Sequence, residues 1–383
     1  MRSFSLIGTD ATKPANQRSR LDSARARADK RCMNLDEPFY DYLMMLRTRI
    51  EAPTEEEIRR QLPRIERFLE SKSDLNTYLG TILNIFELNL WSGWFGRDRS
   101  EIDPAICKIH QIRLLRLAAD DLLALMSDPA YRYDPPEQPP VSVIIPAWNQ
   151  WAFTRDTLAT MFSKTVWPEY EVVVIDNGSE DDTPRELARL APSERRLRVI
   201  RNGRNLGFSE ANNQGVAAAR FEHLIFLNND VLIHSPDWIG QLMRSFLVHP
   251  RIGATGQFGV LDCFDGEREE YYQKVFFPAY SLPLSWVSGF NLLTTRRALR
   301  DAGGWRGDLY GVAGYEDIHL GYAMRQAGWI PVSPCELPVI EHLIGQTRFT
   351  DAGRAFVAAN SPCEDKHKIF CRFFGSRQFR PAA

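Results

Sequence analysis

Three short polar groups, each directly after an apolar run, carry side chains that could bind a ligand. They are Pro-Ala-Trp-Asn at 146–149, Asp-Asn-Gly-Ser at 176–179 and Asn-Asn-Asp at 228–230. Carboxylate oxygens suit hard divalent cations, and amide groups suit hydroxyls and other hydrogen-bonding partners. Asn, Asp and Gly are also the ordinary residues of strand-to-helix turns. Taken singly, each group is explained as well by turn formation as by ligand binding.

The elements that would position these groups alternate between strand and helix. Strands are predicted at 141–146, 170–176, 197–201 and 223–227, and helices begin near 181–184 and span 207–219. The first run is almost wholly apolar, which is typical of a strand buried on both faces of a parallel sheet. Right-handed crossovers wind such units into an open sheet that binds ligands at the carboxyl ends of its strands. The pattern predicts an α/β fold with a mostly parallel, Rossmann-like sheet flanked by helices.

The chain before this repeat has a different character. Residues 1–35 are rich in Arg, Ser and Ala and are predicted to be a disordered tail rather than a secretory signal. Residues 36–133 show successive amphipathic helices, and 134–140 holds four prolines that favour an extended linker. The main domain is predicted to span 141–345, with a C-terminal extension at 346–383. The helical region is predicted to mediate homodimerisation or acceptor docking, with contact to a membrane surface as a further alternative.

Composition narrows the functional classes. Apolar residues make up 44% and charged residues 25%, as in ordinary globular proteins, and the net charge of −2 gives no basic excess for nucleic-acid binding. No apolar window reaches the ~20 residues of a membrane span. The expected location is the cytoplasm, with a peripheral position at the inner membrane face left open. Cys363, His367 and Cys371 recur at helical spacing and could bind zinc, although such residues in a short polar tail more often bind nothing.

Taken together and in order, the motifs resemble those of inverting family 2 glycosyltransferases with the GT-A fold. The resemblance runs from 141 to about 342 and includes Val-Ser-Gly-Phe-Asn at 287–291, Gly-Gly-Trp at 303–305 and Gly-Tyr-Glu-Asp at 314–317. It implies an enzyme that transfers a sugar from a UDP- or dTDP-sugar to an acceptor hydroxyl with inversion. The acceptor would be a glycan, a lipid-linked saccharide, a peptide or a protein. The helical region 36–133 lies outside the resemblance.

The resemblance also assigns a nucleotide pocket and a sugar pocket. Asp176 would accept a hydrogen bond from the imide of uracil or thymine. The other nucleotide-binding positions are Pro146, Trp148, Asn149, Asn205, Gly207, Asn212, Asn228 and Asn229. The sugar and acceptor positions are Gly289, Asn291 and Trp305.

The resemblance assigns metal binding, proton transfer and hydroxyl orientation to four further residues. Asp230 and His342 would bind Mn²⁺ or Mg²⁺, although the family's Asp-x-Asp motif has Asn228 in its first position here. Asp317 would be the general base, and Glu316 would orient hydroxyl groups. A buried structural histidine is the alternative for His342. For Glu316 and Asp317 the alternative is a pair of acids that stabilise a helix N-terminus.

Two other functions are alternatives to the enzyme. A catalytically silent sugar-nucleotide or glycan-binding module would explain Asn228, but it would have little reason to keep Glu316 and Asp317 beside Asp230. A nicotinamide-dependent oxidoreductase would need Gly-x-Gly-x-x-Gly after the first strand, and 146–150 contains no glycine.

Overall fold

The computed structural model of the chain describes residues 121, 125, 128–132, 137–265, 270–276, 283–334, 340–343, 350–360, 362 and 366–374, with the side chains of 261–265, 270–276, 367 and 371 left out. The predicted tail 1–35, most of the helical region 36–133 and the candidate zinc group lie outside this description. None of the helices within it is long and apolar enough to cross a membrane.

A seven-stranded sheet forms the centre of the described chain, in the order β11-β6-β10-β4-β1-β2-β3. Its strands are β1 (Val141–Ala147), β2 (Tyr170–Asp176), β3 (Leu197–Arg201), β4 (His223–Leu227), β6 (Ile252–Gly256), β10 (Asn291–Thr295) and β11 (Ile330–Val332). The pairs β1–β2, β2–β3, β1–β4 and β6–β11 are parallel, whereas β10 runs antiparallel to both β4 and β6. The four predicted strands and the mostly parallel α/β sheet are confirmed.

Two smaller sheets accompany the main one. β5 (Val231–Ile233) pairs antiparallel with β12 (Ile340–His342). β7 (Gly259–Asp265) lies between β8 (Glu270–Phe276) and the short β9 (Trp286–Val287), antiparallel to both.

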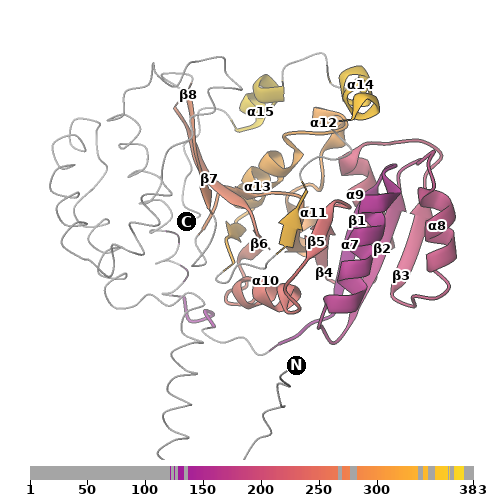
Figure 1. Cartoon of the computed structure of the whole chain (residues 1–383). Coiled ribbons are helices and arrows are strands. Elements are labelled where there is room, and N and C mark those ends of the chain that lie inside the picture. Colours follow the sequence, from indigo (N-terminus) through magenta and orange to yellow (C-terminus); the bar gives the residue numbers. More distant parts are fainter. Residues whose placement is uncertain are drawn as a thin grey trace, which may run out of the picture.

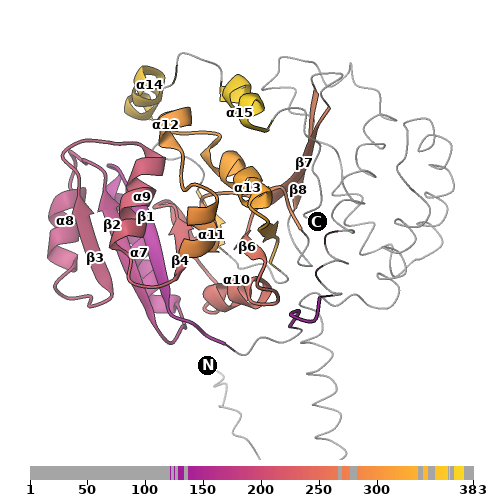
Figure 2. The ribbon, with the colours of Figure 1, turned by 180° about the vertical axis from the view of Figure 1, so that it is seen from behind.

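Helices cover both faces of the main sheet. They are α7 (Trp151–Lys164), α8 (Thr183–Leu190), α9 (Phe208–Ala218), α10 (Trp238–Phe246), α11 (Arg296–Asp301), α12 (Gly307–Tyr310), α13 (Glu316–Gln326), α14 (Asp351–Asn360) and α15 (Lys366–Phe374). Helix α7 lies in front of the sheet in Figure 1, and α9, α11 and α13 lie in front of it in the reverse view of Figure 2. A Cβ at Gly215 of α9 would lie 2.2 Å from Cγ2 of Ile144, so this helix needs a glycine to pack closely on β1.

The strand order explains how distant parts of the sequence meet at one edge. β1 and β4 are parallel neighbours, so the residues that follow Ala147 and Leu227 emerge side by side. β10 is antiparallel to β4 and therefore begins where β4 ends. There the N–H of Asn228 donates to the carbonyl oxygen of Phe290 at 3.0 Å. The edge thus combines the ends of β1 and β4 with the segment before β10.

Candidate active site

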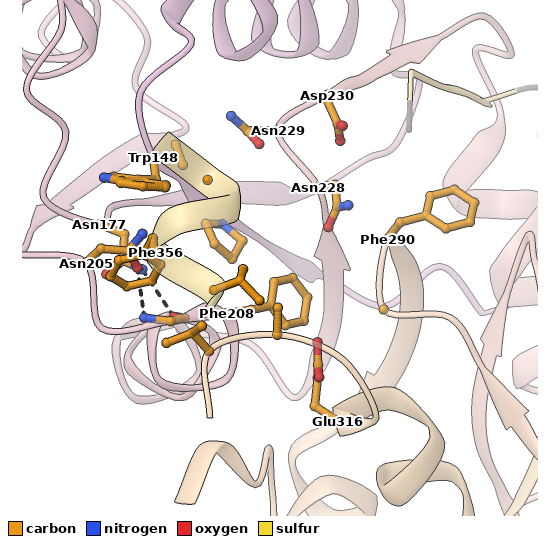
Figure 3. Close-up of a pocket in the computed structure, with 18 of the residues that line it drawn as sticks. Trp148, Asn177, Asn205, Phe208, Asn228, Asn229, Asp230, Phe290, Glu316 and Phe356 are labelled. Atoms are coloured by element: carbon orange, nitrogen blue, oxygen red, sulfur yellow. Dashed lines mark hydrogen bonds between the residues drawn. The ribbon is translucent and has the colours of Figure 1, made fainter. Parts of the chain in front are cut away.

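A cavity of about 340 Å³ opens at this edge of the sheet (Figure 3). It is bordered by the ends of β1 and β4, the segment before β10, the start of α13, the end of β12 and the helix α14. The predicted site residues that line it are Pro146, Trp148, Asn205, Gly207, Asn228, Asn229, Asp230, Gly289, Glu316, Asp317 and His342. The structure therefore brings most of the predicted positions into one cavity, including both members of the predicted metal pair and both acidic residues of α13.

Asn177 organises the loop on one side of this cavity. Its Nδ2 donates to Oδ1 of Asn205 at 2.8 Å and to the carbonyl oxygen of Gly207 at 3.1 Å. Its Oδ1 accepts from the N–H of Leu206 at 3.1 Å and from Nδ2 of Asn202 at 3.0 Å. All four hydrogen bonds of the amide are therefore used to hold the loop between β3 and α9.

The same contacts orient Asn205. Its Oδ1 accepts from Asn177 and also from the N–H of Gly207 at 2.9 Å. Because this oxygen already accepts from two donors, the orientation of the amide is determined. The Nδ2 group of Asn205 is then the part of the amide that can donate to a ligand. Gly207 has φ 88°, and a Cβ there would lie 2.9 Å from Cα of Val312, so the close approach of these two segments requires glycine.

Trp148 closes the cavity together with helix α14. Its ring centroid lies 5.0 Å from that of Phe356, with the two planes at 45°. Figure 3 shows Phe356 reaching from α14 toward Trp148 and the Asn177–Asn205 pair. Gly353, Phe356 and Val357 of α14 line the cavity, while Asp351, Ala355 and Ala359 are exposed. The rings are in direct contact, so a planar ligand does not fit between them in this conformation.

Asp230, Asn228 and His342 meet at the other end of the cavity. Oδ1 of Asp230 lies 3.3 Å from Nε2 of His342, and Nδ2 of Asn228 lies 3.2 Å from the same nitrogen. The imidazole ring stacks on Phe290, with centroids 4.4 Å apart and planes at 7°. An unprotonated Nε2 has one lone pair, which can accept from Asn228 or, in place of that hydrogen bond, can bind a cation together with the carboxylate oxygen of Asp230. Among the described residues no group of three or more His, Cys, Asp or Glu side chains could hold a metal by itself.

Asp317 lies at the start of α13 and faces Gly289. Its Oδ2 accepts from the N–H of Gly289 at 3.3 Å, and its Oδ1 accepts from the N–H of Ile318 at 2.9 Å. Burial raises the pKa of the Asp317 carboxyl above its ordinary value, against the opposing effect of these hydrogen bonds. A carboxyl group with a raised pKa beside a cavity is suited to accept a proton from a bound hydroxyl group.

The charge of the cavity is largely negative. Asp230, Glu316 and Asp317 line it, and none of the described lining residues is Lys or Arg. An anionic ligand such as a diphosphate would therefore need an added cation to neutralise it.

Five predicted site residues do not line the cavity. Asn149 belongs to the neighbouring turn, where its N–H donates to Oγ of Ser179 at 2.7 Å and its Oδ1 accepts from the N–H of Glu180 at 2.8 Å. Asp176 is fully buried, and its Oδ1 accepts from the N–H of Ser179 at 2.9 Å. Its Oδ2 lies 3.5 Å from Nε of Arg201. Base recognition by Asp176 stays a prediction.

Asn212, Asn291 and Trp305 are buried and likewise do not line the cavity. Trp305 supports its floor from behind, because a Cβ at Gly289 would lie 3.1 Å from Cη2 of the indole ring. That ring also contacts Phe208 and Phe226 edge to face, with centroids 5.4 Å and 5.0 Å away. A Cβ at position 289 would therefore push the indole ring back by a few tenths of an ångström, so glycine favours this close approach.

Several lining residues were missed by the sequence analysis. They are Ala147, Asn177, Phe208, Ser288, Phe290, Val312, Ala313, Gly353, Phe356 and Val357. The sequence could have identified Asn177, since it follows Asp176 in the polar group at the end of a predicted strand. The three residues of α14 had none, because they lie in the segment treated as an extension beyond the last recognisable motif.

Comparison with known proteins assigns the domain that contains most of this cavity. Residues 142–302 match the sequence profile of the family described as "Glycosyl transferase family 2". This segment is a family 2 glycosyltransferase domain. The match begins in β1 and ends just after α11, so it includes the three polar groups that follow the strands. The resemblance to this family is thereby confirmed for residues 142–302.

Curated relatives of the family 2 domain come from several bacteria. The chain is 34% identical over 119 residues to the uncharacterized protein y4gI of Sinorhizobium fredii, covering 31% of this chain and 13% of that one. It is 27% identical over 210 residues to the N-acetylglucosaminyl-diphospho-decaprenol L-rhamnosyltransferase of Mycobacterium tuberculosis, covering 45% and 66%. It is 26% identical over 194 residues to the poly-beta-1,6-N-acetyl-D-glucosamine synthase of Staphylococcus epidermidis, covering 48% and 45%. The chain thus spans less than two thirds of each of these relatives.

Solved structures show a more distant similarity. The mannosyltransferase PcManGT from Pyrobaculum calidifontis, in complex with GDP-Man and Mn²⁺, is 22% identical with a TM-score of 0.44, over 61% of this chain and 65% of that one. GalNAc-T7 with UDP, GalNAc and Mn²⁺ is 16% identical with a TM-score of 0.46, over 63% and 53%.

Proposed function

We propose that the chain is a metal-assisted, inverting glycosyltransferase that takes a sugar from a UDP- or dTDP-sugar and transfers it to an acceptor hydroxyl group. The observation that carries this proposal is the arrangement of one cavity. The Asp230–His342 pair, the half-buried carboxyl group of Asp317 and the loop held by Asn177 all border it. The family 2 profile supports the reaction class.

The residues of the cavity fit a divalent cation bound together with the donor. Asp230 supplies a carboxylate and His342 a nitrogen, 3.3 Å from each other, and oxygens of the diphosphate would complete the coordination. A bound Mn²⁺ or Mg²⁺ would neutralise the charge of the departing diphosphate. Asn228 contributes no charge, so Asp230 is the carboxylate on which this site depends.

The remaining residues would bind the nucleoside and take up the proton. Trp148, Pro146 and the loop with Asn205 and Gly207 would hold the base and the ribose. Gly289 would form the floor of the sugar pocket, with the indole ring of Trp305 packed behind it. Asp317 would accept the proton of the acceptor hydroxyl as that oxygen attacks the anomeric carbon from the face opposite the nucleotide, while the bond to the diphosphate breaks. Glu316 would orient the hydroxyl groups.

The acceptor is proposed to be a glycan, a lipid-linked saccharide, a peptide or a protein. Among these acceptors we favour a lipid-linked saccharide, because the mycobacterial relative is an N-acetylglucosaminyl-diphospho-decaprenol L-rhamnosyltransferase. The alternative of a silent sugar-nucleotide-binding module predicts nucleotide binding without turnover.

A donor-hydrolysis screen separates these two functions. Purified chain is incubated with UDP- and dTDP-sugars in the presence of Mn²⁺ or of EDTA, and the released nucleoside diphosphate is measured. We expect slow hydrolysis of one or a few donors that depends on the metal, since water can replace the acceptor. Nucleotide binding without hydrolysis of any donor, even when glycan and lipid-linked acceptors are added, would support the silent module instead.

The contact between Trp148 and Phe356 gives a prediction about donor binding. A base that stacks on this face of Trp148 displaces Phe356, because the centroid distance of 5.0 Å leaves no room between the rings. Phe356→Ala is therefore expected to tighten UDP binding by roughly 2- to 10-fold, the range that corresponds to one aromatic pair. Calorimetric titration with UDP and Mn²⁺ checks this.

The control for this prediction is Arg354→Ala, on the exposed side of α14. The Arg354 side chain is 61% exposed and pairs with Asp351 of the same helix. This variant should bind UDP as the wild type does. Weaker UDP binding by Phe356→Ala would show that the phenyl ring contacts the nucleotide instead of competing with it.

A further inference from the structure

The loop before Glu316 and Asp317 has an unusual backbone. Gly311 and Gly314 have φ values of 72° and 94°, and Tyr315 has a φ of 76° although it is not glycine. A large side chain rarely adopts this left-handed conformation, and it persists only where the surroundings hold it in place. Tyr315 immediately precedes the two carboxylates, so its conformation sets the direction in which α13 begins.

Helix α15 contacts this loop at two points. The ring of Phe370 lies 6.1 Å from that of Tyr315, and both side chains are buried. Nζ of Lys366, one turn earlier in α15, donates to the carbonyl oxygen of Ala313, which lines the cavity. The C-terminal helix therefore holds the loop through a ring contact beside the carboxylates and through a hydrogen bond at the cavity wall.

Tyr315 also packs on Tyr310 of α12. The ring of Tyr310 is fully buried and lies 6.0 Å from that of Tyr315. The hydroxyl group of Tyr310 lies 2.9 Å from Nδ1 of His319, on the next turn of α13. Tyr315 is thus held between α12 and α15, and α13 is tied to the same cluster. In Figure 2, α12 and α15 lie near the top of the coloured ribbon and α13 lies below them.

We propose that Phe370 is a positioning residue of the transfer reaction: by packing on Tyr315 it maintains the left-handed turn that directs Glu316 and Asp317 into the cavity. This inference rests on the proposed function. It extends the active site to a C-terminal helix that lies outside the family 2 match at 142–302. Removal of the ring would let Tyr315 relax and would misplace Asp317, while the nucleoside loop around Asn177 and the Asp230–His342 pair keep their own contacts.

Helix α15 itself offers a matched control. Phe373 is 45% exposed, and its ring contacts His319 at 5.3 Å and not Tyr315. Phe370→Ala and Phe373→Ala remove the same side chain from the same helix. Only the first removes the contact with the loop, together with the ring contact between Phe370 and Tyr322 of α13 at 5.0 Å. Phe370→Leu restores an apolar side chain at the position and serves as the rescue variant.

Donor hydrolysis, UDP binding and hydrogen exchange are measured on all three variants. Phe370→Ala is expected to lower kcat by about 10- to 100-fold, because small displacements of a reacting group have effects of this size. The affinity for UDP with Mn²⁺ should remain unchanged, and hydrogen exchange should rise at 311–317. Phe370→Leu should recover most of the activity, and Phe373→Ala should resemble the wild type.

Three results would overturn the proposal. They are a wild-type kcat in Phe370→Ala, an equal loss in Phe373→Ala, or a loss of UDP binding parallel to that of kcat, which would indicate general unfolding. If the wild-type chain hydrolyses no donor, the proposed function fails, and hydrogen exchange still decides whether Phe370 holds the loop. Unchanged exchange at 311–317 in Phe370→Ala would then refute the positioning role by itself.

Discussion

Asp317→Asn is expected to lower kcat by about 10²- to 10⁴-fold, the usual contribution of general base catalysis, while UDP binding with Mn²⁺ stays at the wild-type level. Asn has nearly the same shape and keeps an oxygen that can accept from the N–H of Gly289 or Ile318, but it cannot take up a proton. The measurement pairs the rate of donor hydrolysis with a calorimetric titration of UDP. Because the Asp230–His342 pair would bind the metal and the diphosphate, the two readouts should separate.

Asp308→Asn is the matched control for this variant. Asp308 lies in α12 close to the same loop, and its carboxylate pairs with Arg306 at 2.7 Å with 62% of the side chain exposed. Loss of an exposed ion pair has a small effect on stability, so this variant should keep the wild-type rate. If Asp317→Asn retained full activity, or lost UDP binding together with activity, Asp317 would not be the base.

The raised pKa of Asp317 makes the activity of the wild type, and the stability difference between it and Asp317→Asn, depend on pH. Burial raises this pKa in the folded chain, and the base works only when it is deprotonated, so kcat should increase as pH rises through the raised value. The folded chain also binds this proton more tightly than the unfolded chain. The contribution to stability is therefore fully present below the unfolded pKa and is lost as pH rises through the folded pKa. Asp317→Asn should accordingly be more stable than the wild type at neutral pH, with the difference disappearing in acid.

Local patterns were sufficient to predict the parallel half of the fold. The strands at 170–176, 197–201 and 223–227 were predicted with the bounds that the structure has, because buried apolar runs between turn residues are a local signal. The antiparallel direction of β10 and its position in the sheet were not predicted. Its place between β4 and β6 depends on pairing between residues that are far apart in sequence, such as Asn291 with Leu227. Such pairing leaves no mark in either segment alone.

The site shows the same division between local and long-range information. Most predicted residues at the ends of β1 and β4 line the cavity, since the ends of parallel strands meet at one edge. At the end of β2, however, Asn177 lines the cavity and Asp176 is buried, and neighbouring residues of an extended chain point in opposite directions. The contact between Trp148 and Phe356 joins two residues that are far apart in sequence. It therefore arises from tertiary packing alone.

Asp230→Ala is expected to abolish the metal-dependent part of UDP binding, a loss of at least about 100-fold in affinity with Mn²⁺, because removal of a group that merely supports a metal ligand already costs about 10- to 100-fold. Asp230 is buried beside His342 and is the carboxylate at this end of a cavity whose described lining has no Lys or Arg. Without the Asp230 carboxylate the cation would bind more weakly. The negative charge of the diphosphate would then be repelled by Glu316 and Asp317. Titration of UDP with Mn²⁺ and with EDTA measures the effect.

Two further variants make this result specific to the metal site. Glu341→Ala removes an acid next to His342 whose carboxylate points away to His234 at 3.0 Å, and it should bind UDP as the wild type does. Asn228→Asp restores a second carboxylate beside Nε2 of His342, so it should increase the affinity for Mn²⁺ and the dependence of UDP binding on it. If Asp230→Ala kept the full response to Mn²⁺, or if Asn228→Asp left it unchanged, the cation would have to bind elsewhere. Charge at this end of the cavity would then not control donor binding.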